Sequence, residues 1–146
     1  MAVVIRSGLQ DLELTETISP DDDSLRARTA YPVSWEIGAA SSAVVYFELD
    51  PGCHLGTHAH SCEETVLVLE GSVEMSVEEE STREAAGSLL VVPARARHDV
   101  RCVGEAPARC VGYFPSASVQ TLYEQRLGPD GERVQGTPVP DRIEGL

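Results

Sequence analysis

The sequence contains no lysine and no asparagine, so all eleven of its basic residues are arginine. The missing lysine excludes Schiff-base catalysis and the phosphate-binding lysine of P-loop proteins. Basic residues are also scarce, because 24 aspartates and glutamates outnumber them and give a formal net charge of −13. A surface this acidic repels nucleic-acid backbones and anionic lipids. We therefore expect neither nucleic acid nor a membrane as a partner.

Long hydrophobic runs are missing as well. The apolar start at residues 1–5 is too short for the core of a signal peptide, and no segment approaches the length of a membrane span. The chain has four cysteines, which are Cys53, Cys62, Cys102 and Cys110. They form no CxxC pair and are too sparse for a disulfide scaffold. These features predict a cytoplasmic protein with reduced, mostly buried cysteines.

What is present fits one globular domain of 146 residues, 42% hydrophobic and 24% charged. Glycine, proline and acidic clusters separate short segments rich in apolar and β-branched residues. This punctuation favours an all-β sandwich or barrel over alternating strands and helices. The predicted strands are residues 33–37, 43–48, 57–60, 64–69, 72–77, 89–92, 98–103 and 108–114.

We divide the chain into three parts. Residues 1–30 form an N-terminal arm, in which residues 3–5 are a candidate edge strand. The β-barrel is expected over residues 31–115. In the remaining part, residues 116–146, the start signal and mixed polarity of residues 116–126 predict a short helix, and residues 128–131 a turn. From Gly136 onward, with Pro138 and Pro140, we expect a tail.

Three of the four histidines stand at spacings that suit a metal site built on strands. His58 and His60 are two residues apart, so in an extended strand both imidazoles point to the same face. Glu64 opens the next strand after a break long enough for a turn, and His98 follows another apolar strand. Imidazole and carboxylate together suit the divalent ions of Fe, Mn, Ni, Co, Cu and Zn.

Two sequence patterns include these residues. The first, G-x5-H-x-H-x3-E-x6-G, is filled by Gly52, His58, His60, Glu64 and Gly71. The second, G-x5-P-x-G-x2-H-x3-N, is filled by Gly87, Pro93 and His98, with Arg95 in place of its second glycine and Cys102 in place of its asparagine. Together they resemble the two motifs of the cupin superfamily. Arg95 stands where a glycine would supply a positive φ.

The resemblance implies an antiparallel jelly-roll β-barrel, the double-stranded β-helix, here with a short C-terminal helix or tail. It also implies that His58, His60, Glu64 and His98 bind one divalent transition metal. Our order is Fe or Mn first, then Ni or Zn, with Co and Cu also compatible. Four protein ligands leave one or two positions open on a metal that prefers six, as a catalytic site requires. The resemblance further implies a homodimer.

Four further residues are candidates for substrate contact. His54 lies an even number of positions before His58 and His60, so in an extended strand it would point to the same face. The alternative is that His54 is a loop histidine in solvent. Tyr46 is a candidate acid or base facing the cavity. Arg95 belongs to a group of arginines that could clamp a carboxylate or phenolate, unless they are simply solvated or paired. Cys102 should point inward below the metal, where it tunes the site or only fills space.

Three functions remain open. The first is a dioxygenase-type oxidoreductase in which Glu64, as the catalytic residue, leaves the metal to take a proton. The second is a metal-dependent lyase, isomerase or epimerase, in which the metal acts as a Lewis acid. The third is a non-catalytic small-ligand binder. An apolar lining expected from Val66, Val68 and Val92 favours a small, largely apolar or aromatic substrate over a sugar.

Overall fold

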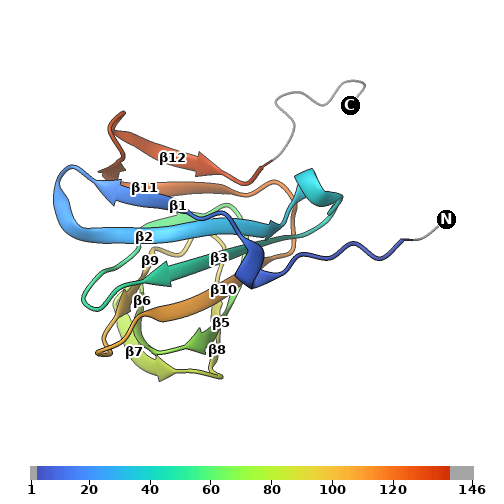
Figure 1. The fold of residues 1–146 in the computed structure, drawn as a ribbon. Coiled ribbons are helices and arrows are strands. Elements are labelled where there is room, and N and C mark those ends of the chain that lie inside the picture. Colours follow the sequence, from blue (N-terminus) through green and yellow to red (C-terminus); the bar gives the residue numbers. More distant parts are fainter. Residues whose placement is uncertain (1–2, 139–146) are drawn as a thin grey trace.

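The computed structural model describes residues 3–138, which fold into two antiparallel six-stranded sheets (Figure 1). The first sheet runs in the order β1 (Thr15–Ser19), β2 (Asp22–Val33), β3 (Ala43–Leu49), β10 (Ala108–Phe114), β5 (Glu64–Glu70), β8 (Leu89–Val92). The second runs β12 (Glu132–Gly136), β11 (Gln120–Leu127), β4 (His58–His60), β9 (His98–Cys102), β6 (Ser72–Val77), β7 (Glu80–Ala85). Two short 3-10 helices, η1 (Leu9–Asp11) and η2 (Trp35–Ile37), complete the described elements.

Apolar residues recur at every second position along the strands, and this alternation decides which side chains lie between the sheets. Along β5, Glu64, Val66 and Val68 are buried while the residues between them are partly exposed. Along β9, Val100 and Cys102 are buried in the same register as His98. Each apolar side chain buried in this way stabilises the fold by about 1.5–3 kcal/mol. The predicted all-β, antiparallel jelly-roll fold is confirmed.

The main apolar core lies between β3, β5 and β10 on one side and β6 and β9 on the other. Its largest members are Phe47, Leu49, Val66, Val68, Val73, Met75, Val92 and Val100. Cys102 and Cys110 belong to the same cluster, and all four cysteines of the chain are free thiols. The metal-site histidines are placed beside this core, on β4 and at the start of β9.

The helix predicted over residues 116–126 is wrong, because this segment contributes most of strand β11. Thr121, Tyr123 and Leu127 are buried and alternate with exposed residues, which is the period of a strand. Pairing with β4 on one side and β12 on the other overrides the local helix signal. The predicted tail begins at Gly136, the last residue of β12, and its part beyond residue 138 lies outside the described residues.

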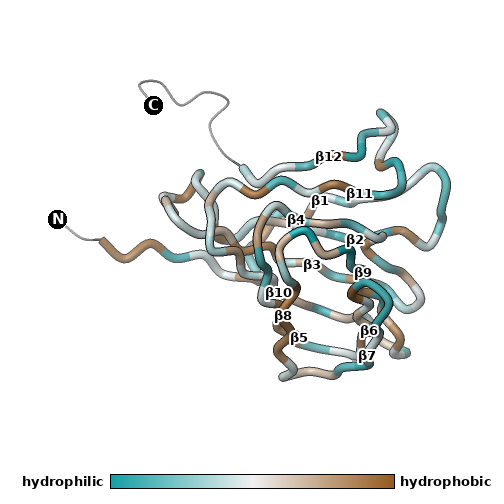
Figure 2. The backbone as a smooth tube through the Cα atoms, turned by 180° about the vertical axis from the view of Figure 1, so that it is seen from behind, coloured by the Kyte–Doolittle hydropathy of each residue, from teal (hydrophilic) through white to brown (hydrophobic). Residues whose placement is uncertain are grey.

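The N-terminal arm is shorter than predicted. Strands β1 and β2 occupy much of residues 15–33 and extend the first sheet beyond β3, so the β fold is wider than residues 31–115. Residues 3–5 form no strand; they are exposed and apolar, and Figure 2 shows them projecting from the sheets. The strand expected at residues 33–37 is also wrong, because η2 occupies residues 35–37. Within residues 3–138 no helix has the length and apolar character needed to cross a membrane.

Candidate metal centre

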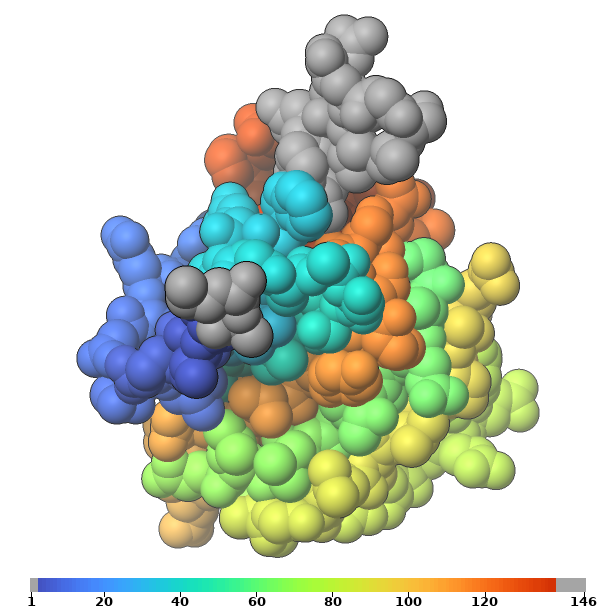
Figure 3. Space-filling view, turned by 90° about the vertical axis from the view of Figure 1, so that its right-hand side faces the viewer, coloured from blue at the N-terminus to red at the C-terminus, as the bar shows by residue number. Residues whose placement is uncertain are grey.

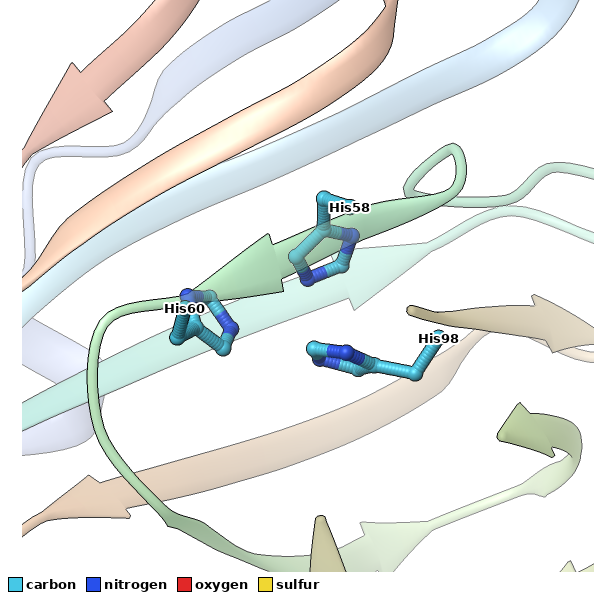
Figure 4. Close-up of side chains that lie close together, drawn as sticks. All are labelled: His58, His60 and His98. Carbon is cyan, nitrogen blue, oxygen red and sulfur yellow. The ribbon is translucent and has the colours of Figure 1, made fainter. Parts of the chain in front are cut away.

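Strands β4 and β9 bring three histidines together. His58 and His98 are direct partners in the antiparallel pairing of these strands. His60 lies two residues along β4 and points to the same side. The side chains converge (Figure 4), and one ligand nitrogen from each lies within 4.8 Å of those of the other two. All three residues are buried.

Backbone carbonyls set the orientation of two imidazoles. His58 Nδ1 lies 2.6 Å from the carbonyl oxygen of Gly56, and His98 Nδ1 lies 2.9 Å from that of Ala96. A carbonyl oxygen can only accept, so each Nδ1 carries the hydrogen and each Nε2 keeps a free lone pair. His60 Nδ1 contacts Thr121 Oγ1 at 2.7 Å. Such contacts behind a histidine fix its ring for metal binding.

Glu64 of β5 faces these nitrogens from the opposite sheet. Its Oε1 lies 3.4 Å from His60 Nε2 and 3.4 Å from His98 Nε2. Both nitrogens are buried and have no hydrogen-bond partner among the described residues. A lone pair that faces a carboxylate oxygen at this distance is repelled unless a cation lies between them. A metal bound at about 2.1 Å from each donor separates neighbouring donors by roughly 3.0–3.4 Å. The residues therefore fit a divalent metal.

The protonation states agree with this fit. Burial, together with the neighbouring His98 and His60, lowers the pKa of His58 well below its ordinary value, so this imidazole is neutral. Burial alone would raise the pKa of Glu64, but hydrogen bonds and attraction from His60 and His98, acting as positively charged donors, outweigh it and lower this pKa to about 2. A divalent ion in the same place favours the ionised carboxylate in the same way. The carboxylate is therefore ionised. Neutral imidazole and ionised carboxylate are the forms that bind metal.

A glycine on the neighbouring strand makes room for Glu64. A Cβ built on Gly112 of β10 would overlap the Oε2 atom of Glu64, so any side chain there displaces the carboxylate. The sequence analysis did not single out Gly112. The only signal was a glycine inside a strand pattern, which indicates a close approach without saying to what.

A cavity of about 40 Å³ adjoins His58, His60 and Glu64, three of the four candidate ligands. One part of its wall is apolar and consists of Val45, Phe47, Leu55 and Phe114. The rest is polar but uncharged and consists of Thr29, Tyr31, Thr121, Tyr123 and Gln135. The predicted apolar lining of Val66, Val68 and Val92 is corrected, because these residues lie in the core and not on this wall.

Two tyrosines, Tyr31 and Tyr123, line the cavity. The ring of Tyr123 stacks on that of His58, with centroids 5.0 Å apart and an angle of 27° between the planes. Burial raises the pKa of Tyr31 and of Tyr123, so both hydroxyls stay protonated at neutral pH. Sequence reasoning missed both residues because it placed no strand at β11 and only an undivided arm before residue 31.

Three of the predicted substrate contacts lie outside the cavity. Tyr46 is on the outer side of β3, where its hydroxyl donates to Glu48 Oε2 at 2.6 Å. Arg95 is exposed; it takes the left-handed φ of 65° that glycine would favour, and its N–H donates to the His60 carbonyl at 2.8 Å. Cys102 is buried in the core and its thiol points to the Ala106 carbonyl, 3.3 Å away.

His54, the fourth predicted contact, is neither in the cavity nor in solvent. It is buried between two carboxylates, with Nδ1 2.6 Å from Asp99 Oδ2 and Nε2 2.9 Å from Asp22 Oδ2. The other oxygen of Asp99 accepts the Gly56 N–H at 2.9 Å. Because the Gly56 carbonyl in turn accepts from His58, this cluster holds the turn that orients a metal-site histidine.

The fold and the site together define a double-sheet β protein with a three-histidine, one-glutamate centre between its sheets. The family model described as "Cupin domain" matches residues 45–114. The resemblance to the cupin superfamily that the two motifs predicted is therefore confirmed over residues 45–114. No curated protein sequence matches it significantly.

Solved structures share the fold at low sequence identity. A protein from Acidithiobacillus ferrooxidans, assigned as a sugar phosphate isomerase, aligns with a TM-score of 0.64 and 17% identity, covering 92% of this chain and 90% of that one. Oxalate decarboxylase from Lactobacillus farciminis aligns with a TM-score of 0.68 and 18% identity over 80% of this chain. This chain covers only 34% of that decarboxylase. A structure of the Bacillus subtilis oxalate decarboxylase, studied for its Mn(II) centres, gives a TM-score of 0.60, 17% identity and coverage of 73% and 29%.

Proposed function

We propose that this protein is a divalent-metal-dependent enzyme acting on a small organic substrate, with His58, His60, Glu64 and His98 as the ligands. One observation carries the proposal: two imidazole nitrogens without a hydrogen-bond partner face a buried carboxylate oxygen at 3.4 Å, beside a cavity. Leaving each nitrogen unsatisfied costs about 1–3 kcal/mol, so an arrangement of this kind is maintained for a ligand.

Fe and Mn are our first choices for the metal. The Mn(II) centres named for one structural neighbour support manganese, while the ligand set also suits Ni, Zn, Co and Cu. A bound divalent ion supplies a Lewis acid that polarises a carbonyl or hydroxyl oxygen. An imidazole that binds a metal through its lone pair brings no charge, and the Glu64 carboxylate brings one negative charge, so these four ligands would leave a net positive charge on the ion available to substrate.

A lyase or isomerase reaction has the best support from the cavity wall. Tyr31 and Tyr123 place protonated hydroxyls where they can donate to a substrate oxygen and exchange a proton with it. Glu64, with its pKa lowered to about 2, is a weak base. Its principal role is therefore that of a ligand, and the catalytic role predicted for it would require it to leave the metal first.

A dioxygenase is the second candidate. The apolar wall of Val45, Phe47, Leu55 and Phe114 supports it, since such a wall accommodates an apolar or aromatic substrate and the metal has room for dioxygen. The two candidates differ in their need for oxygen. A reaction that requires dioxygen stops under nitrogen, whereas a lyase or isomerase reaction continues.

The test is a screen of small carbonyl and hydroxycarbonyl compounds with protein loaded separately with Fe(II) and Mn(II), in air and under nitrogen. For any compound turned over, Tyr31→Phe should lower kcat by about 100-fold if its hydroxyl transfers a proton. Tyr113→Phe is the matched control, because Tyr113 is exposed and does not line the cavity. Turnover that is equal with and without metal would contradict the proposal.

We further propose that the protein is a homodimer that pairs through the outer face of its first sheet. Leu89 and Val91 of β8 and Tyr113 of β10 are exposed there, and β8 is the edge strand of the sheet. Two copies of one apolar patch are self-complementary about a twofold axis. Light scattering of the wild type and of Leu89→Asp tests this: a monomeric wild type would contradict it.

A further inference from the structure

A second, larger hollow adjoins the metal cavity. It has a volume of about 540 Å³ and shares Thr29, Tyr31 and Gln135 with the cavity wall. Its other residues come from four segments: the chain around η1 and β1, strand β2, η2, and the end of β12. Figure 3 looks at this end of the molecule and shows the cyan segment around η2 beside the dark-blue N-terminal segment. We call this hollow the vestibule.

The charges of the vestibule are all negative. Among the described residues that line it, the charged ones are Glu13 and Glu36, and both are exposed. No ion pair involves either of them within residues 3–138. The cavity beyond adds one more carboxylate, Glu64. A substrate therefore passes two carboxylates to reach a third.

Arginines that could balance these charges are engaged elsewhere. Arg28 binds Asp50 with both terminal nitrogens, at 3.0 and 2.9 Å, and Arg126 binds Asp21. Within residues 3–138, no arginine lines the cavity or the vestibule. Arg95 was expected to clamp a carboxylate or phenolate. In the described part of the site, no arginine is placed to do so.

The charge balance at the site limits the substrate. A divalent ion with three neutral imidazoles and one carboxylate has a net charge of +1, and Glu13 and Glu36 bring the whole region to −1. A phosphate ester or dicarboxylate would carry a negative charge into the vestibule, where none of the described lining residues is a cation, at a cost in desolvation and repulsion. Uncharged hydroxyl, carbonyl and amide groups instead find hydrogen-bond partners in Thr29, Tyr31 and Gln135.

We propose that this site selects small, oxygen-bearing molecules whose part in the vestibule is uncharged, such as hydroxycarbonyl compounds, and rejects phosphate esters and dicarboxylates. The proposal rests on the metal-centred function proposed above and specifies its substrate class. Glu13 and Glu36 act as specificity residues through their charge, without touching the reacting atoms.

Two probes of equal shape test the proposal. Succinohydroxamic acid and its amide, succinamohydroxamic acid, carry the same metal-binding hydroxamate and differ only at the far end, which is a carboxylate in one and a carboxamide in the other. Protein loaded with Co(II) would be titrated with each at low ionic strength, and the change in visible absorption gives Kd. We expect the amide to bind about 10-fold more tightly than the carboxylate.

Substitutions in the vestibule then test whether its two glutamates cause the preference for the amide probe over the carboxylate probe. Glu13→Gln/Glu36→Gln should tighten binding of the carboxylate probe several-fold and leave the amide probe unchanged. The matched control, Glu79→Gln/Glu80→Gln, removes the same charge from the exposed end of the β6–β7 turn and the start of β7, and it should preserve the 10-fold preference. A wild type that binds the carboxylate probe as tightly as the amide, or binds neither probe, overturns the proposal.

The Co(II) spectrum keeps the two proposals apart. It reports the metal centre before any probe is added, so a protein that takes up no Co(II) at its histidines contradicts the proposed function itself. Uptake of Co(II) followed by preference for the carboxylate probe contradicts only the substrate class.

Discussion

His58 and His98 are partners in the pairing of β4 with β9, and their ring centroids lie 4.1 Å apart. The two residues belong to different motifs and meet only because these strands are neighbours in the second sheet. The register of one short strand pair therefore decides whether a metal site exists. A shift of one residue would turn His98 to the outer face.

Removing either partner should remove the metal. We expect His58→Ala and His98→Ala to be purified with little metal, while the wild type grown in metal-defined medium carries about one ion per chain, measured by elemental analysis. Arg83→Ala is the control, because Arg83 is exposed on the edge strand β7 and is not one of the converging residues. Equal metal in the wild type and in His98→Ala would show that the site is assigned incorrectly.

Gly112→Ala should weaken metal binding by about 10–100-fold, as changes behind a metal ligand commonly do. The added methyl group would displace the Glu64 carboxylate. Gly104→Ala is the matched control, because the nearest atom to its new Cβ, outside the adjacent residues, is Ser72 Cβ at an ordinary 3.6 Å. Calorimetric titration with Mn(II) or Co(II) measures both. A folded Gly112→Ala protein with the affinity of the wild type would contradict the role of this glycine.

Gly56→Ala should lower both stability and metal affinity. Gly56 has a φ of 91°, and a Cβ there would lie 2.5 Å from Leu25 Cδ1, so the turn that orients His58 must shift. Gly87→Ala separates the two causes, because Gly87 has a similar φ of 96° but open space around its Cβ. We expect Gly87→Ala to cost only about 1–2 kcal/mol of backbone strain and to keep full metal affinity. Urea unfolding and metal titration of both variants give the comparison.

The cluster of Asp22, His54 and Asp99 should make stability depend on pH. The hydrogen bond to Asp99 is the largest cause that raises the pKa of His54, and the hydrogen bond to Asp22 raises this pKa further. Burial and the nearby positive charge of Arg101 lower the pKa but do not cancel the increase. Because the pKa of His54 is higher in the folded than in the unfolded protein, its protonation stabilises the fold. This contribution is complete at pH values below the unfolded-state pKa of about 6.5, and it disappears as the pH rises through the folded-state pKa. The hydrogen bonds from Ser24 and His54 lower the pKa of Asp22, so its contribution is present above about pH 4 and is lost in acid.

We therefore expect His54→Gln to lose about 1–3 kcal/mol of unfolding free energy near pH 5, and clearly less at pH 9. Urea unfolding in EDTA at each pH measures the difference without interference from metal. A difference between the wild type and His54→Gln that stays constant from pH 5 to pH 9 would mean that His54 is not held as a cation between the two carboxylates.

The segments that carry the two motifs were predicted with nearly correct bounds. Strands β3, β5, β6, β8 and β10 match the predicted ranges to within one residue, because their apolar residues alternate strongly and glycines or prolines end them. β2 and β11 were missed for the opposite reason. Arginines, threonines and glutamates occupy many of their positions, and a sequence with so weak an alternation does not distinguish a half-exposed strand from a helix or an arm.

The amino-acid sequence alone pointed to the cupin fold and to His58, His60, Glu64 and His98, because these residues belong to two motifs that resemble those of the cupin superfamily. The cavity wall, the acidic vestibule and the partners of His54 depended on the tertiary structure. Tyr31 comes from β2 in the first sheet, whereas Tyr123 and Gln135 come from the paired strands β11 and β12 in the second, about 90 or more residues later, and only the packing of the two sheets brings them to one cavity. Side chains brought together by packing have no common spacing in the sequence, and for that physical reason no pattern in the sequence could identify them.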